Sequence, residues 1–129
     1  MDTVRKITKE LAIAGQLTLD ELQQLAEEGY RSVVNLRSPN ESGFLDSEQQ
    51  KAEHLGLCYV NLPIQTQKMN LDDVLPIIQQ LTGLAKPMLV HCDNGRRASI
   101  VVLLQIAIEQ GMKAEDAFQR VENLDLLSD

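Results

Sequence analysis

The sequence predicts a single α/β domain built as a three-layer sandwich, with a mostly parallel central sheet flanked by helices. Two observations favour this fold class. Short apolar segments alternate with amphipathic segments along the chain, which is the pattern of strands joined by crossover helices. No internal repeat, low-complexity tract or linker interrupts the 129 residues, so we expect one domain over residues 1–129 with a hydrophobic core of its own.

Four apolar segments are predicted to be strands, at residues 11–15, 32–36, 57–62 and 87–91. The first is expected near a sheet edge. In α/β sheets, ligands bind at the carboxyl ends of the strands. Because Arg37 and Cys92 directly follow two of these segments, we expect both side chains at the binding edge of the sheet.

Five helices are predicted between and after these strands. The first begins at Thr18, which forms a capping-box pattern with Glu21, and it ends at Gly29. The third lies between residues 71 and 84 with Asp73 as its N-cap, which places Pro76 where its missing N–H costs little. The others cover residues 47–55, 100–108 and 114–122. The segment 100–108 is apolar nearly all round, which predicts a buried helix.

Composition narrows the classes of partner and compartment. The net charge is −7, which argues against a nucleic-acid partner. No segment has the length of a membrane span, and the N-terminal residues carry no apolar signal segment. The two cysteines, Cys58 and Cys92, do not suggest a disulfide framework, so a reducing cytoplasmic location is expected. Nothing in the sequence predicts the oligomeric state.

The segment from Pro87 to Ser99 carries the predicted chemistry. A buried strand leads into Cys92, a polar loop with a glycine and two arginines follows, and a long helix then begins. A helix N-terminus and nearby guanidinium groups favour the thiolate form of a cysteine. Gly95 allows successive loop N–H groups to point inward, and Arg97 offers two parallel donors to a phosphoryl group.

These features predict that Cys92 attacks phosphorus and forms a phosphocysteine, which water then hydrolyses. Cys92 and Arg97 are the predicted catalytic residues, and no cofactor is expected. The predicted phosphate-binding residues are Asp93, Asn94, Gly95, Arg96, Arg97 and Ala98. The expected partner is a phosphorylated protein or a small phosphate ester.

Several neighbouring residues allow two interpretations each. His91 can support the thiolate loop or be a structural histidine, and Ser99 can contact the thiolate or bond to backbone in the first helical turn. Arg96 can contact substrate or be solvated. Arg37 can add positive charge to the rim of the site or pair with Glu41 on the surface. Inside an apolar strand, Cys58 is expected in the core, and His54 is expected at the surface. A metal site is not expected, because the sequence has only two histidines and no ligand spacing.

The cysteine loop resembles the signature of the cysteine-dependent protein tyrosine and dual-specificity phosphatases, which is His-Cys, five residues, Arg, then Ser or Thr. His91, Cys92, Gly95 and Ser99 fall in register with it, but Ala98 stands at the arginine position and Arg97 comes one residue early. This spacing resembles a bacterial branch labelled beta-lactamase hydrolase-like. The resemblance covers most of the chain, including the segments Ile13-Ala14-Gly15-Gln16, Gly29, Val33-Val34-Asn35-Leu36-Arg37 and the strand before Pro63. It implies a phosphotyrosine protein phosphatase-like fold.

The resemblance also implies a general acid, usually an aspartate on a loop before the cysteine strand. Aligning residues 65–71 with that loop places Gln65 at the position of the acid. Glutamine cannot donate a catalytic proton, and Asp73 is assigned to the helix cap, which leaves Asp72 as the nearest other carboxylate. We therefore expect no strong general acid, and we expect aryl phosphates to react far better than alkyl phosphates.

Two further functions compete with phosphate ester hydrolysis. Rhodaneses, which transfer sulfur through a cysteine persulfide, also have an active loop of Cys, four residues, Arg. This chain lacks their early Asp-x-Arg-x-x-x-Glu-type segment and their Gly-Gly-Trp ending, and it contains no tryptophan. The third possibility is a pseudophosphatase module that binds phosphate but turns over poorly because the acid is missing.

Overall fold

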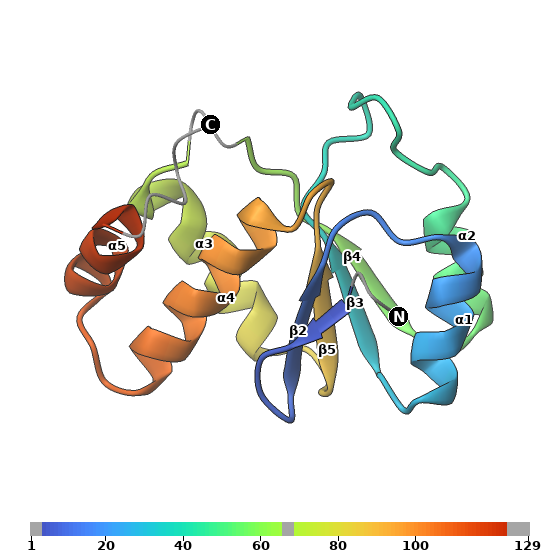
Figure 1. Ribbon diagram of the computed structural model, residues 1–129, viewed down its shortest axis with the longest axis horizontal. Helices are drawn as coiled ribbons and strands as arrows, with labels where there is room; N and C mark the ends of the chain where they lie inside the picture. Colours follow the sequence, from blue (N-terminus) through green and yellow to red (C-terminus); the bar gives the residue numbers. More distant parts are fainter. Residues whose placement is uncertain (1–3, 66–68, 124–129) are drawn as a thin grey trace.

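The computed structural model describes residues 4–65 and 69–123. Within these residues, a five-stranded sheet forms the centre of the molecule, with the strand order β1-β2-β5-β3-β4 (Figure 1). Strand β1 pairs antiparallel with β2, whereas β2, β5, β3 and β4 are mutually parallel. The strands are β1 (Val4–Lys6), β2 (Leu11–Ala14), β3 (Ser32–Asn35), β4 (Cys58–Asn61) and β5 (Met88–His91). The predicted α/β class with a mostly parallel sheet is confirmed.

Helices cover both faces of the sheet. Helices α1 and α2 lie on one face, and α3, α4 and α5 lie on the other (Figure 1). Each layer has its own hydrophobic cluster, with Leu22 and Leu25 of α1 on one side of the sheet and Ile100 and Leu104 of α4 on the other. The helices are α1 (Leu19–Glu27), α2 (Glu48–His54), α3 (Leu71–Thr82), α4 (Arg96–Glu109) and α5 (Ala114–Asn123).

Strand β5 lies between β2 and β3, and its alternating side chains determine which layer each functional residue enters. Val90 and Cys92 pack in the cluster on the α4 side, and Leu89 packs in the cluster on the α1 side. Since side chains alternate along a strand, His91 points toward the α1 and α2 layer. The cysteine and the histidine before it therefore occupy opposite layers of the domain.

Two sequence predictions about local structure are wrong. Asp73 is not the N-cap of α3, because the side chain of Asn70 holds that position and its Oδ1 accepts the Asp73 N–H at 3.0 Å. Pro76 consequently lies inside the helix. Cys58 is exposed rather than in the core. It is the first residue of β4, which is an edge strand. Among the described residues, β4 pairs with β3 alone.

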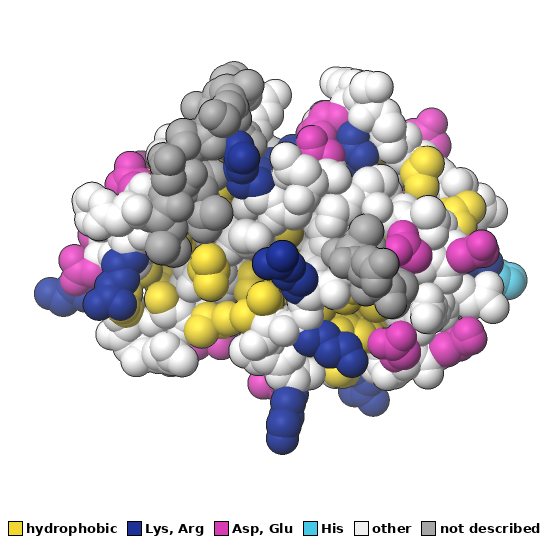
Figure 2. All heavy atoms as spheres, viewed as in Figure 1, with side chains coloured by type: hydrophobic (Ala, Val, Ile, Leu, Met, Phe, Trp, Pro, Cys, Tyr) yellow, Lys and Arg dark blue, Asp and Glu magenta, His cyan; other side chains and the backbone are white. Residues whose placement is uncertain are grey.

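The two helical layers present different side chains at the surface. Helix α4 is largely buried, as its nearly all-round apolar sequence predicts, although Leu103 is 36% exposed on its outer side. Figure 2 shows hydrophobic side chains at the surface over α4, and acidic side chains gathered over α1. No helix among the residues that the structure describes has both the length and the apolar character needed to cross a membrane.

Candidate active site

The cysteine loop joins the end of β5 to the start of α4. Cys92 is fully buried, and its Sγ accepts a hydrogen bond from the Gly95 N–H at 3.0 Å. Gly95 is the N-cap of α4 and has a φ of 89°, a left-handed conformation that glycine adopts without the steric cost of a side chain. The loop therefore turns so that a backbone donor and the positive end of the α4 dipole both face the sulfur.

Other amides of this loop already have acceptors. The Asn94 N–H donates to Asp93 Oδ1 at 2.8 Å, and the Arg96 N–H donates to Asn94 Oδ1 at 2.9 Å. The Cys92 N–H donates to the Ala14 carbonyl oxygen at 3.2 Å. Side-chain oxygens therefore accept hydrogen bonds from two of the backbone N–H groups that the sequence predicts to bind an anion.

The end of β2 packs closely against the cysteine loop. The Gln16 N–H donates to the Asp93 carbonyl oxygen at 3.1 Å. A Cβ atom built on Gly15 would lie 2.9 Å from that same oxygen, which is closer than real Cβ contacts allow. Gly15 is therefore required for the close approach of two backbone segments, and this approach fixes the position of the loop.

Arg97 lies in the first turn of α4, its side chain is 7% exposed, and its guanidinium group is held by two carboxylates. Nη1 and Nη2 bind the two carboxylate oxygens of Glu41 at 2.8 and 2.9 Å, and Nη2 also binds Asp93 Oδ1 at 3.0 Å. Nη1 donates in addition to the Ile64 carbonyl oxygen at 2.9 Å. The predicted phosphate-binding arginine thus lies beside the cysteine loop with its fork occupied by Glu41.

These ion pairs shift the ionisation of the groups involved. The hydrogen bond from Arg97 lowers the pKa of Glu41 to about 2, with further contributions from the Ser38 N–H and Arg37. The same hydrogen bond raises the pKa of Arg97. Burial opposes ionisation of Asp93, but the contact with Arg97 prevails and lowers its pKa. Glu41, Asp93 and Arg97 are therefore all charged at neutral pH.

Arg37 is buried, although a surface ion pair was one of its two interpretations. Its Nε donates to Glu41 Oε1 at 3.2 Å, its Nη1 donates to Gln16 Oε1 at 2.7 Å, and its Nη2 binds the Ser42 carbonyl oxygen. Arg37 thus shares Glu41 with Arg97, so that two buried guanidinium groups flank one carboxylate.

His91 is fully buried and contacts a residue that sequence reasoning missed. Its Nε2 lies 2.6 Å from Oε2 of Glu48, which is also fully buried, and its Nδ1 lies 3.3 Å from the Cys92 carbonyl oxygen. Burial raises the pKa of Glu48, but the hydrogen bond and charge of His91 bring it below its ordinary value. Glu48 begins a polar helix, and nothing in its sequence neighbourhood distinguishes it from an exposed glutamate.

The remaining predicted residues have distinct surroundings. Ser99 Oγ donates to the Gly95 carbonyl oxygen at 2.7 Å, which is the backbone contact that was one of its two interpretations. Ala98 is buried behind the loop, and His54 is exposed as expected. In the parts of the chain that the structure describes, no three His, Cys, Asp or Glu side chains gather in a way that could hold a metal ion.

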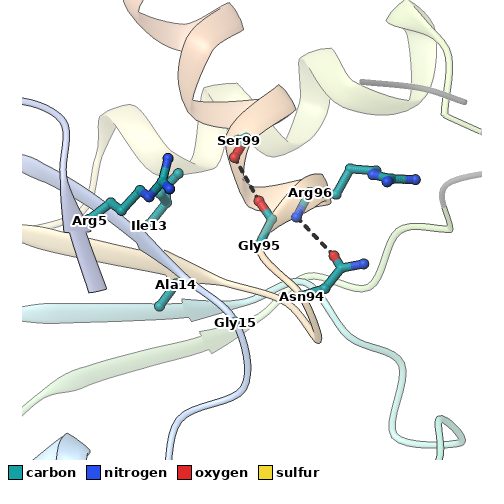
Figure 3. A pocket seen from close by; sticks show the side chains of 8 residues that line it. All are labelled: Arg5, Ile13, Ala14, Gly15, Asn94, Gly95, Arg96 and Ser99. Atoms are coloured by element: carbon teal, nitrogen blue, oxygen red, sulfur yellow. Dashed lines mark hydrogen bonds between the residues drawn. The ribbon is translucent and has the colours of Figure 1, made fainter. Parts of the chain in front are cut away.

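A cavity of about 480 Å³ lies beside the cysteine loop, between the loop and the end of β2. Figure 3 shows Arg5 and Ile13 on one side of it and the loop residues on the other, with the Arg96 side chain extending away from Arg5. Its lining consists of Arg5, Ile13, Ala14, Gly15, Asn94, Gly95, Arg96 and Ser99. Two arginines in this lining favour an anionic occupant.

The loop expected to hold a general acid is described in part, because Thr66, Gln67 and Lys68 lie outside the described residues. Gln65 is exposed, and it lines a second cavity of about 390 Å³ together with Ser38 and Asp73. Since Asn70 caps α3, Asp73 is not engaged as the N-cap. Asp73 therefore lies on the wall of the same cavity as Gln65, the residue at the predicted acid position.

Several known proteins have sequences similar to this chain. Residues 3–110 match the family described as "Beta-lactamase hydrolase-like protein, phosphatase-like domain". A beta-lactamase hydrolase-like protein of Xylella fastidiosa is 34% identical over 114 residues, which cover 85% of this chain and 26% of that protein. A relative in Agrobacterium fabrum is 26% identical over 126 residues. The chain thus spans about a quarter of the length of the curated relatives it matches.

Solved structures with the same fold include phosphatase candidates from two bacteria. The one from Shewanella putrefaciens has a TM-score of 0.77 at 22% identity and covers 91% of this chain and 76% of that chain. The one from Neisseria meningitidis has a TM-score of 0.72 at 25% identity, with 95% of this chain and 87% of that chain covered. TpbA of P. aeruginosa, solved with phosphotyrosine, has a TM-score of 0.72 at 15% identity, with 98% and 75% covered. The chain therefore belongs to the family of phosphatase-like domains of beta-lactamase hydrolase-like proteins.

Proposed function

We propose that the protein hydrolyses phosphate monoesters, with aryl phosphates favoured, through a phosphocysteine formed on Cys92. The observation that carries this proposal is the hydrogen bond from the Gly95 N–H to Cys92 Sγ at the N-terminus of α4. A backbone donor and a helix dipole at the sulfur stabilise negative charge there, which is what a thiolate nucleophile needs.

In the proposed reaction, the sulfur attacks phosphorus, and the ester oxygen leaves with the bonding electron pair. Water then attacks the phosphocysteine, which releases inorganic phosphate and regenerates the thiolate. Arg97 would bind two phosphoryl oxygens, and it exchanges Glu41 for the substrate when it does so. The loop amides at residues 94 and 96 would exchange Asp93 and Asn94 oxygens for phosphoryl oxygens in the same way.

The cavity beside the loop would hold the organic part of the ester. Its two arginines, Arg5 and Arg96, favour a substrate with an additional negative charge near the phosphate. Both a phosphorylated acidic peptide and a small phosphorylated acid fit this description. A cytoplasmic location is part of the proposal, since a free thiol stays reduced there.

Sulfur transfer is the second candidate function. The observation that favours it is the guanidinium of Arg97, which already binds Glu41, Asp93 and a carbonyl oxygen. A persulfide on Cys92 would need one or two hydrogen-bond donors, and the Gly95 N–H is already one of them. It would not need the two parallel donors of Arg97.

The test is an assay with an aryl phosphate on the intact chain and on two variants. Cys92→Ser should abolish hydrolysis, and Cys58→Ser, which changes the other cysteine, should leave the rate unchanged. Hydrolysis that persists in Cys92→Ser would overturn the proposal. Thiocyanate formed from thiosulfate and cyanide, without ester hydrolysis, would establish the second candidate instead.

A further inference from the structure

We propose that Glu48 is a positioning residue that keeps His91 in its imidazolium form and thereby directs positive charge at the Cys92 loop. The inference rests on the proposed thiolate chemistry of Cys92 and adds a residue on a different helix to it. Glu48 lies 43 positions before His91, and both side chains are fully buried where they meet.

The ring nitrogens of His91 both face oxygen acceptors. Nε2 faces the Glu48 carboxylate at 2.6 Å, and Nδ1 faces the Cys92 carbonyl oxygen at 3.3 Å. Burial raises the pKa of Glu48, but the contact with His91 brings it below its ordinary value, so the carboxylate is ionised and can only accept. A neutral imidazole carries a hydrogen on one nitrogen alone, so beside an ionised Glu48 it would set a ring lone pair against the lone pairs of one of these oxygens. The doubly protonated ring donates to both, and an ionised Glu48 then balances its charge.

The groups around Glu48 fit an ionised carboxylate. Gln16 Nε2 donates to its Oε1 at 2.7 Å, and Asn35 Nδ2 approaches its Oε2 at 3.4 Å. Arg37 binds the other end of the Gln16 amide at 2.7 Å, which orients that amide with its N–H₂ toward Glu48. The Tyr59 hydroxyl is the remaining titratable group nearby, and burial raises its pKa, so it stays neutral.

The direction of the ion pair determines its effect on the cysteine. His91 precedes Cys92 in the chain and bonds to its carbonyl, whereas Glu48 lies on the far side of the ring. The positive end of the pair therefore lies next to the backbone of Cys92. Arg97 adds positive charge from α4, and Asp93 and Glu41 offset that charge through their contacts with Arg97. Removing Glu48 would neutralise His91 and withdraw the positive charge that lies beside the Cys92 backbone.

The test compares Glu48→Gln with Glu53→Gln, a matched change at an exposed position of the same helix. The readout is the ultraviolet absorbance of the Cys92 thiolate against pH, taken as the difference between each protein and its Cys92→Ser counterpart. We expect the midpoint of Glu48→Gln to rise by about one pH unit, which is a tenfold loss of thiolate below the midpoint, and that of Glu53→Gln to stay in place. An unchanged midpoint in folded Glu48→Gln would overturn the inference.

A second measurement uses the unaltered chain, in case Glu48→Gln fails to fold. Nitrogen-15 NMR of the histidine rings distinguishes the imidazolium from either neutral tautomer, and the chain has only two histidines to assign. We expect His91 to be doubly protonated at neutral pH, whereas a neutral ring would refute the inference. Neither measurement uses a phosphate ester, so a failed hydrolysis assay would leave both results interpretable.

Discussion

Arg97 and Glu41 form a two-point ion pair, with both carboxylate oxygens bound by the guanidinium group at 2.8 and 2.9 Å. They come from the first turn of α4 and from the loop between β3 and α2, 56 residues apart in the chain. The pair has the geometry that an arginine uses to bind a phosphoryl group. Glu41 therefore binds the donors that the proposed substrate needs, and in the proposed reaction a phosphoryl group would replace Glu41 at Arg97.

The first prediction concerns the fork of Arg97. Lysine keeps the charge but has one nitrogen, so Arg97→Lys cannot bind two oxygens in parallel. We expect kcat/KM for an aryl phosphate to fall about 100-fold, which is typical of the loss of a preorganised donor. Arg120→Lys, at an exposed position of α5, is the control and should match the unaltered chain. Equal activity of the Arg97→Lys and Arg120→Lys proteins would show that Arg97 does not bind the phosphoryl group.

The second prediction concerns stability in acid. The hydrogen bond from Arg97 lowers the pKa of Glu41 to about 2 in the folded protein. A carboxyl group with a lowered folded pKa stabilises the protein fully above its unfolded pKa, and this contribution is lost as the pH falls through the folded value. The side chain is 26% exposed, so solvent screening reduces the contribution to on the order of 1 kcal/mol.

Denaturant unfolding of the unaltered chain and of Glu41→Gln at a series of pH values measures this contribution. The unaltered chain should be more stable at neutral pH, and the difference in the free energy of unfolding should shrink from about pH 5 toward pH 2. A difference that stays constant over this range would mean that the ion pair does not account for it.

The third prediction concerns the contact between β2 and the cysteine loop. A Cβ atom at position 15 would lie 2.9 Å from the Asp93 carbonyl oxygen, which is a backbone atom rather than the end of a flexible side chain. Gly15→Ala should reduce the free energy of unfolding by about 1–3 kcal/mol and should lower activity, because the loop must shift. Gly83→Ala is the matched control, since its Cβ would meet one atom, at an ordinary 3.8 Å. Similar thermal unfolding and activity of the two variants would contradict this account of the loop.

The fourth prediction concerns the leaving group. The resemblance places Gln65 at the position of the general acid, and glutamine cannot donate a proton, so we expect the leaving oxygen to depart without protonation. We expect kcat to fall steeply as the leaving group becomes more basic, and we expect no decline of kcat as the pH rises above neutrality. A declining alkaline limb that disappears in Asp73→Asn would contradict this prediction and would identify Asp73 as the acid.

Local signals in the sequence accounted for most of the framework. The capping box of Thr18 and Glu21 is present as predicted, with reciprocal hydrogen bonds of 2.8 and 3.1 Å. The short strand Val4–Lys6 was not predicted, because three residues with two exposed basic side chains carry no strand pattern. Its pairing with β2 is a tertiary effect that a local pattern does not encode.

The site was predictable where it is local and not where it depends on distant parts of the chain. The cysteine, the glycine turn and the start of the helix follow one another in sequence, and the structure holds them together as expected. Glu41 and Glu48 reach the site across 56 and 43 residues, from a loop and a polar helix. The sequence indicated a pair of Glu41 with nearby Arg37, but it gave no indication that Glu41 would also bind Arg97 or that Glu48 would be buried against His91, because a charged residue in such a segment is normally solvated.

The most direct test of the central claim is to trap the covalent intermediate. The protein is mixed with an aryl phosphate, quenched in acid during turnover, and digested, and the peptide containing Cys92 is examined by mass spectrometry. The account predicts a phosphate adduct on Cys92 that is absent when Cys92→Ser is treated in the same way. Substrate turnover with an unmodified Cys92 peptide, or an added sulfur atom on Cys92 after thiosulfate in place of the phosphate adduct, would contradict it.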